Sequence, residues 1–343
     1  MKTAYLIYPF SDIDPRTPYV IGFKISQILN KLGYKVVIKP WNYIGQVTPN
    51  HAEDILIGHA HPNPYTIFRR SVGMNGWDKR ILCQPFNADM GQLGYLRSVV
   101  RFVDCFVAIC GKGWHDTLPK VGLRIEDRTQ FVDLAVDSSM FPKLKLVTEN
   151  RGILYIGNND RCKNTIVLRD LEAAGFTVGS VGANIGLKNH HGYLSLTSDD
   201  ARHVLKKYRF LVVPSFNDAN PTVVLEAMSL GLIPVISHTC GYLEVDGPIV
   251  ISSHKSENWI IEMRKLVNKK SANLDQISKQ NYEKIINHYQ WARFCDDVTN
   301  IIIRTSRKQG EYQRGELKLI VNELLGNRFF LRPSLLRDIK WYD

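Results

Sequence analysis

The residues best suited to chemistry gather between Val212 and Ser237, in the segment VVPSFNDANPTVVLEAMSLGLIPVIS. Asp218 lies in a predicted loop, and Glu226 follows eight positions later in a predicted helix. Both carboxylates are suited to accept hydrogen bonds from the hydroxyl groups of one ligand. The alternative is that the two acids make ordinary caps of a loop and a helix.

The same segment predicts a helix whose first turn faces a ligand. Ser215 ends a buried strand, Asn220 is a suitable N-cap, and Pro221 suits the first helical position. Free amides and the helix dipole make such a start a binding site for anions. We therefore expect Ser215, Asn220, Pro221 and Thr222 to bind a diphosphate or sugar hydroxyls.

A second polar loop follows the predicted strand GILYIG, in the stretch GILYIGNNDRCKN. Gly157 lets the backbone pass close to a ligand, and Lys163 supplies a point charge for a pyrophosphate. Arg161 is a candidate second cation. The alternative for both cations is an ordinary solvated loop.

The first half of the chain carries His59 and His61 at the end of a predicted strand. No third ligand has the spacing for a metal site with them, so either a structural role or a polar, cleft-lining role is expected. Asp12 and Asp14 form a D-x-D sequence, whose two carboxylates are suited to bind a metal ion. Their place between a strand and Pro15 favours a turn or an N-cap.

Short apolar runs that alternate with helical patterns indicate how these residues are positioned. Ten strands are predicted, at 3–8, 34–38, 55–58, 80–84, 105–109, 130–136, 152–157, 177–181, 210–213 and 234–237. Helices are predicted at 19–32, 166–174, 198–208, 221–230 and through most of 257–303. Buried strands separated by helices are typical of parallel sheets covered on both faces.

The pattern runs twice, which predicts an α/β chain of two Rossmann-like domains. We expect residues 1–146 to form an N-terminal domain and 147–303 a C-terminal domain, with a basic aromatic tail at 304–343. Parallel sheets bind ligands beyond the carboxyl ends of their strands. Two such sheets are expected to face a central cleft.

The segment PSFNDANPTVVLEAMSLGLIPV resembles the Glu-x7-Glu motif of glycosyltransferase family 4. Asp218 stands where that family has its first Glu, and Ala219 stands in place of a Gly. Weaker similarity extends to 131–142, 239–253 and 288–297. The resemblance implies the GT-B fold and a retaining glycosyltransferase. It also implies that residues 1–146 form the acceptor domain and residues 147–303 the nucleotide-sugar donor domain.

The resemblance also implies roles for the candidate residues. Glu226 is expected to bind the ribose and Asp218 the donor sugar. Lys163 matches a phosphate-binding Lys, while Asn158 occupies the position of the family's Arg and Arg161 is its possible substitute. Asp218, His59 and His61 are therefore the catalytic candidates, with the histidines toward the acceptor and donor sugar.

The expected activity is transfer of a sugar from a nucleoside-diphosphate sugar to a glycan or a lipid-linked acceptor. No metal is required by this scheme, because a helix N-terminus and cations neutralise the departing phosphate. Three alternatives remain: a non-catalytic nucleotide-sugar-binding subunit, a nucleotide-sugar epimerase and a DNA-modifying transferase. A nucleic acid partner is not expected.

The net charge of +11 is unevenly distributed. Residues 1–148 carry +6, residues 149–303 carry +1 and the tail 304–343 carries +4. Such a distribution either serves solubility or attracts an anionic membrane surface, and the tail either binds that surface or packs on the N-terminal domain. Six scattered cysteines and no apolar run of membrane-spanning length indicate a cytoplasmic protein. The charge distribution leaves open a peripheral position on the inner face of a membrane.

Overall fold

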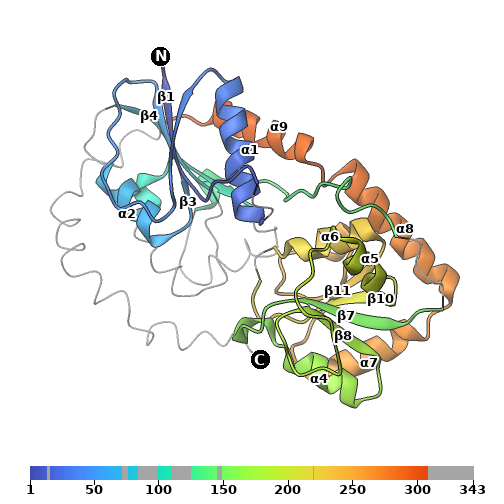
Figure 1. Cartoon of the computed structure of the whole chain (residues 1–343). Coiled ribbons are helices and arrows are strands. Elements are labelled where there is room, and N and C mark those ends of the chain that lie inside the picture. The colour runs from blue at the N-terminus through green and yellow to red at the C-terminus, as the bar shows by residue number, and fades with distance from the viewer. Residues whose placement is uncertain are drawn as a thin grey trace. The chain divides into compact units, whose positions relative to one another are not determined.

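The computed structural model describes residues 1–13, 16–71, 76–83, 99–109, 125–144, 149–218 and 220–307 (Figure 1). These residues form two compact units. Each unit contains one sheet of six parallel strands. The predicted α/β architecture of two Rossmann-like domains is confirmed.

The first unit is built on a sheet with the strand order β2-β1-β3-β4-β5-β6. Its strands are β1 (Thr3–Ile7), β2 (Lys35–Lys39), β3 (Asp54–His59), β4 (Trp77–Cys83), β5 (Cys105–Ala108) and β6 (Thr129–Phe131). Its helices are α1 (Thr17–Lys31), α2 (Pro62–Arg70) and the short η1 (Val100–Phe102) and η4 (Glu126–Arg128). All five residues of β1 are buried, as expected for a central parallel strand.

The second unit has the strand order β12-β11-β10-β7-β8-β9. Its strands are β7 (Gly152–Gly157), β8 (Val178–Gly182), β9 (Asn189–His190), β10 (Tyr208–Val213), β11 (Ile233–Ser237) and β12 (Ile249–Ile251). Its helices are η5 (Arg161–Lys163), α4 (Ile166–Ala173), α5 (Asp199–Leu205), α6 (Thr222–Leu230), η6 (Glu244–Asp246), α7 (Ser256–Val267) and α8 (Ser271–Asn287).

Helices cover both faces of the second sheet. Figure 1 shows α4 and α7 on one face and α6 on the other, and α8 packs beside α6. Alternate residues of the central strands, such as Phe210 and Val212 of β10, join the core beneath α4 and α7. Trp259 of α7 is the largest side chain that is fully buried there. This packing holds the carboxyl ends of β7, β10 and β11 at one edge.

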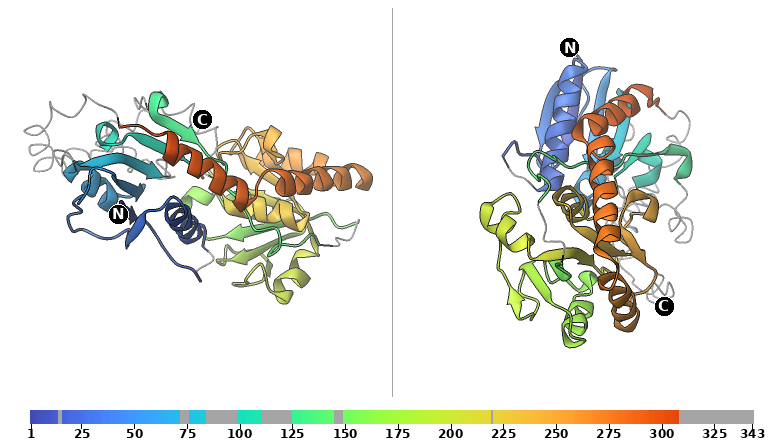
Figure 2. Two further views of the ribbon diagram at one scale, coloured as in Figure 1. Left: turned by 90° about the horizontal axis from the view of Figure 1, so that it is seen from above. Right: turned by 90° about the vertical axis from the view of Figure 1, so that its right-hand side faces the viewer.

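The last described helix, α9 (Trp291–Arg304), returns to the first unit, to which the described residues from Phe294 to Arg307 belong. Both views of Figure 2 show α9 beside elements of that unit. The ammonium of Lys79 in β4 donates to the carbonyl of Ile302, 3.0 Å away. Sequence analysis had placed residues up to 303 in the second domain.

Residues 133–144 belong to the second unit rather than to the first. The strand predicted at 130–136 ends at Phe131, because the amide of Val136 donates to the carbonyl of Tyr289, not to a strand. Farther along, the amide of Leu144 donates to the carbonyl of Leu230. This segment is therefore fixed along α6 and α8 by backbone hydrogen bonds.

No helix among the described residues is long and apolar enough to cross a membrane. Residues 308–343, which include nearly all of the predicted basic aromatic tail, lie outside the described residues, as does Asp14 of the D-x-D sequence.

Candidate active site

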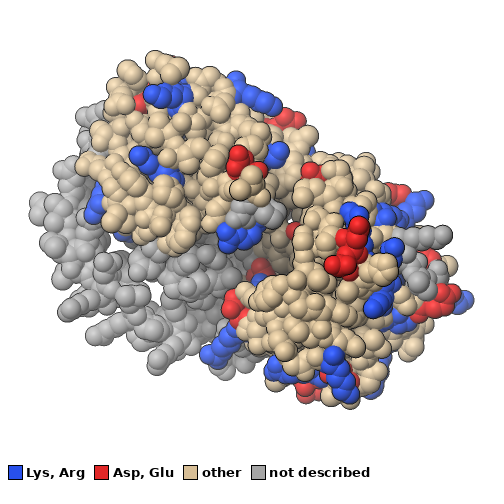
Figure 3. All heavy atoms as spheres, viewed as in Figure 1, with Lys and Arg blue, Asp and Glu red and all other residues tan. Residues whose placement is uncertain are grey.

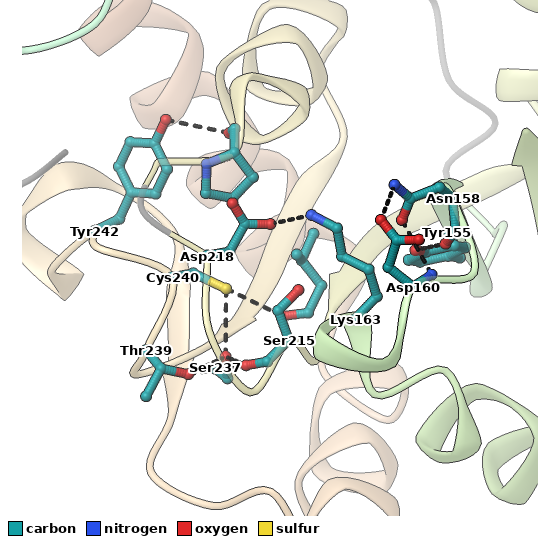
Figure 4. A network of polar contacts seen from close by, with 12 residues as sticks. Tyr155, Asn158, Asp160, Lys163, Ser215, Asp218, Ser237, Thr239, Cys240 and Tyr242 are labelled. Carbon is teal, nitrogen blue, oxygen red and sulfur yellow. Dashed lines mark hydrogen bonds and ion pairs between the residues drawn. The ribbon is translucent and has the colours of Figure 1, made fainter. Parts of the chain in front are cut away.

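Two loops of the second unit meet at the carboxyl ends of neighbouring strands (Figure 4). One follows β7 and contains η5, and the other joins β10 to α6. The amide of Phe216 donates to the carbonyl of Cys162 across 2.7 Å. Beside this contact, the ammonium of Lys163 lies 2.5 Å from a carboxylate oxygen of Asp218. The fold thus brings together Lys163, which is predicted to bind phosphate, and Asp218, which is predicted to bind the donor sugar.

A third loop, which follows β11, supports the other two. The hydroxyls of Ser237 and Thr239 donate to the carbonyl of Ser215 across 2.5 and 2.8 Å. The amide of Asp218 donates to the carbonyl of Thr239, and the thiol of Cys240 donates to the carbonyl of Val213. Sequence analysis missed these residues. Their position after a strand parallel to β10 is the signal that predicts them.

Helix α6 begins one residue later than predicted. Pro221 is its N-cap residue and Thr222 is its first residue, so Asn220 is not the N-cap, contrary to the prediction. The backbone of Pro221 is extended (φ −63°, ψ 115°), and proline has no side-chain acceptor for the first amides of the helix. These amides have no side-chain cap, which is typical of an anion-binding helix start.

Two buried polar atoms near this helix start have no hydrogen-bond partner among the described residues. They are the hydroxyl of Ser215 and the side-chain carbonyl of Asn220. Buried polar groups in native proteins nearly always have partners. The two atoms are therefore suited to a polar ligand.

Glu226 lies in the second turn of α6, and its side chain is half-buried. Burial raises the pKa of this carboxyl from its ordinary value of 4.5 to about 7. Neither an ion pair nor a hydrogen bond joins the Glu226 side chain to another described residue. A buried carboxyl without a cation is costly to ionise, and its two oxygens remain available as acceptors.

Lys163 remains a cation in spite of its burial. Desolvation acts to lower the pKa of its ammonium, but the charge of Asp218 and their hydrogen bond outweigh it, and the pKa is raised. Arg161 is exposed and makes no ion pair with another described residue. The loop itself is fixed, since the hydroxyl of Tyr155 donates to the carbonyl of Asn158 across 2.5 Å. Gly157 ends β7 directly before this loop, where an added Cβ would lie 2.8 Å from the Tyr155 hydroxyl.

The two first-unit histidines have different surroundings. His59 packs its ring 4.8 Å from that of Tyr8, and its Nδ1 atom is buried without a described partner. Burial lowers the pKa of His59 to about 4, so its imidazole is neutral at physiological pH. His61 is the N-cap residue of α2, where its Nδ1 accepts from the amide of Asn63, and its ring packs against Trp41. His61 therefore has a structural role.

Metal ligands do not cluster in the part of the chain that the structure describes. No group of three or more His, Cys, Asp or Glu residues there could hold a metal ion.

Residues 182–284 match the family model described as glycosyl transferases group 1. No curated protein sequence matches the chain. The match spans α6, with Asp218 and Glu226, but begins after the loop that contains Lys163.

Solved structures share the fold at low sequence identity. Anabaena HepE, in complex with UDP and glucose, has a TM-score of 0.64 and 12% identity over 88% of this chain and 99% of its own. A sucrose-phosphate synthase from Thermosynechococcus elongatus has a TM-score of 0.64 and 11% identity over 89% and 98%.

TarM has a TM-score of 0.56 and 12% identity over 74% of this chain, which spans about half (55%) of TarM. Identities this low establish similarity of fold, and that fold is the predicted GT-B architecture. Residues 182–284 thus form a domain of the glycosyl transferases group 1 type within a chain that has the GT-B fold.

Proposed function

We propose that the protein is a retaining glycosyltransferase that transfers a sugar from a nucleoside-diphosphate sugar to a glycan or lipid-linked acceptor. The observation that carries this proposal is the Glu226 carboxyl, half-buried on α6 with a raised pKa and without a cation among the described residues. Vicinal ribose hydroxyls would satisfy both of its oxygens. Ribose binding would not need a cation beside Glu226, because hydroxyl groups can donate hydrogen bonds to its carboxyl group in either protonation state.

Positive charge at the same edge of the sheet supports a diphosphate ligand. The ammonium of Lys163 and the uncapped amides at the start of α6 lie in neighbouring loops of the same edge. In our proposal these groups neutralise the departing phosphate, so that no metal ion is required. We therefore expect sugar transfer to continue when excess EDTA removes divalent metal ions.

The comparisons add support at the level of ligand class. HepE is described in complex with UDP-glucose, and TarM with UDP and α-GlcNAc-glycerol. A nucleotide sugar as donor is consistent with both. Arg161, exposed beside Lys163, is a further candidate for the phosphates.

Ligand-induced stabilisation tests the proposal. UDP, GDP, ADP and their sugar derivatives are added singly, and thermal unfolding is followed. A ligand at 100 times its Kd stabilises the folded state by about 2.7 kcal/mol. We expect one base to stabilise the wild type, and Glu226→Gln to lose most of that shift.

The matched control is Glu257→Gln, which removes an exposed glutamate from another helix of the same unit. This variant is expected to keep the full ligand-induced shift. An equal shift in wild type and Glu226→Gln would refute the ribose assignment, and no shift with any nucleotide would refute the donor class.

A second candidate function is a non-catalytic nucleotide-sugar-binding subunit. The observation in its favour is that Asp218, the expected sugar ligand, is engaged by Lys163. Incubation of the isolated protein with the stabilising nucleotide sugar separates the candidates. Slow release of free sugar with retained anomeric configuration supports the transferase, free altered donor indicates an epimerase, and an intact donor supports the subunit.

A further inference from the structure

A cavity of about 690 Å³ in the second unit is lined by none of the residues assigned to the donor site. Its wall consists of residues 247–249, which lead into β12, and of one face of α8 between Ile277 and His288. Ligand-binding cavities in proteins commonly measure about 300–1,000 Å³. The cavity therefore has the size of a ligand site and is separate from the proposed active site.

Gly247 and Asn281 form a closely packed part of this wall. An added Cβ at Gly247, whose φ is +120°, would lie 2.7 Å from the Oδ1 atom of Asn281. Glycine therefore allows the loop before β12 to lie directly against α8. Asn281 is only 2% exposed, and its Nδ2 atom has no hydrogen-bond partner among the described residues. An unpaired amide donor in the wall of a cavity indicates a polar ligand.

The charged side chains around the cavity already have partners. The ammonium of Lys284 donates to a backbone carbonyl of η6. The Nε2 atom of His288 lies 2.8 Å from a carboxylate oxygen of Asp133, and the carboxylate of Glu283 lies 3.8 Å from the ammonium of Lys279. The charges of these two lysines and two acids cancel. The cavity is therefore better matched to a neutral ligand than to an ionic one.

Three carboxamides supply the remaining polar groups of the wall. Gln280 and Asn287 are exposed, and neither side chain makes a hydrogen bond to another described residue. With Asn281, they lie on the cavity side of α8. Each carboxamide both donates and accepts hydrogen bonds, as a sugar hydroxyl does. Ile249 and Ile277 add apolar surface that suits the C–H groups of a sugar ring.

We propose that this cavity binds a neutral oligosaccharide, at a site separate from that of sugar transfer. The inference goes beyond the proposed function and does not depend on which nucleotide sugar is the donor. The three carboxamides are the polar contacts of the ligand. Where the acceptor is a glycan, such a site would hold the chain on the enzyme between transfers, which raises its effective concentration.

Titration of the full chain with uncharged oligosaccharides tests the inference. Maltopentaose, cellopentaose, chitopentaose and mannopentaose are added singly, and binding is followed by ligand-observed NMR. We expect at least one of them to bind the wild type. The double variant Gln280→Ala and Asn287→Ala should bind it at least about tenfold more weakly, because two hydrogen-bonding side chains are lost. Both side chains are exposed, so the variant is expected to fold like the wild type.

The matched control is the double variant Gln27→Ala and Asn30→Ala, which removes two exposed carboxamides from α1 of the first unit. It should bind the oligosaccharide as the wild type does. Hydrogen exchange in α8 should slow when the oligosaccharide is bound to the wild type. A nucleotide that stabilises the wild type should stabilise both double variants equally, because neither variant changes the donor site.

The outcomes separate this inference from the proposed function. If none of the four oligosaccharides binds the wild type, the inference is wrong. It is also wrong if the Gln280 and Asn287 variant binds as tightly as the control, since the sugar then lies elsewhere. Tighter binding of pentagalacturonate, a uronic acid chain, would overturn the assignment of a neutral ligand. Nucleotide binding can persist in each of these cases, so the proposed function would stand.

Discussion

Desolvation raises the pKa of the Glu226 carboxyl, so the folded state favours its neutral form. The hydroxyl of Ser215 and the side-chain carbonyl of Asn220 are also buried without a described partner. Residues arranged for a ligand commonly cost stability in its absence. Here the cost is electrostatic, and it should depend on pH.

The pH dependence of stability tests this cost. The folded-state pKa of Glu226, about 7, lies above its ordinary value of 4.5, so the folded state binds more protons between these values. Stability contributed by the protonated carboxyl is therefore lost as pH rises from 4.5 to 7. Glu226→Gln removes the loss, and without ligand we expect it to exceed the wild type by roughly 2–3 kcal/mol at pH 8.

The measurement is urea unfolding of wild type and variant at pH 8 and pH 5. At pH 5 the difference should shrink to less than about 1 kcal/mol, because the folded wild type is then protonated. Glu257→Gln, which changes an exposed side chain, should show no such pH-dependent gain. A gain from Glu226→Gln of equal size at both pH values would contradict the electrostatic explanation.

At the scale of elements, the site depends on how closely the loops after neighbouring strands approach each other. The loop after β8 crosses the end of β7, where the amide of Ala183 donates to the carbonyl of Gly157 across 2.9 Å. Gly182 makes this crossing possible. Its φ is +105°, and an added Cβ would lie 2.3 Å from the Gly157 carbonyl oxygen.

Replacing Gly182 tests whether this crossing fixes the phosphate loop. We expect Gly182→Ala to cost at least about 3 kcal/mol, because backbone strain is combined with a backbone clash. It should also weaken nucleotide binding, since the clash displaces Gly157. Thermal unfolding and nucleotide titration measure the two effects.

Gly175 provides a control with a similar backbone. Its φ is +93°, but no atom lies within 4 Å of the position that a Cβ would take. Gly175→Ala should therefore cost only about 1 kcal/mol and leave nucleotide binding unchanged. Equal losses from the two substitutions would show that the crossing has no special role.

At the scale of the whole molecule, the chain passes from the first unit to the second and returns through α9. Phe294, Val298 and Ile302 occur every four residues on its buried face. The first unit therefore depends for its packing on residues of α9, which follow the second unit in the chain.

Truncation of Phe294 tests this dependence. We expect Phe294→Ala to destabilise the first unit by about 3–5 kcal/mol, because a fully buried aromatic side chain is lost. Hydrogen exchange should accelerate in β4 much more than in β10. Ile303→Ala changes a side chain of the same helix that is 60% exposed and should leave exchange nearly unchanged. Equal acceleration in β4 and β10 would argue against the assignment of α9 to the first unit.

Net charge gives a second prediction at this scale. On the described part of the face in Figure 3, Lys and Arg side chains are scattered rather than gathered in one patch. The sequence nevertheless carries +11, with +6 in residues 1–148 and +4 in 304–343. We expect flotation with vesicles that contain phosphatidylserine but not with phosphatidylcholine vesicles, and loss of binding at high salt. Equal and negligible binding to both would remove the membrane hypothesis.

The repeated strands and helices could be predicted from the amino-acid sequence, because their apolar residues recur with the period of each element. The strand at 152–157 has the predicted bounds, and α6 differs from its prediction by one residue. Three short elements, β9, β12 and α2, were not predicted, because they contain too few residues to show a period. In addition, α2 begins at Pro62 and contains Pro64. Similarity of motif also identified Lys163, Asp218 and Glu226 as candidates.

Only the tertiary structure decided how these candidates are joined. The contact between Lys163 and Asp218, and the support from Ser237 and Thr239, arise because parallel strands far apart in the chain end at one edge of a sheet. The helical pattern of α9 likewise does not show that this helix returns to the first unit. Periodicity reports which face of an element is buried, but the partner that buries it is set by packing over long sequence distances.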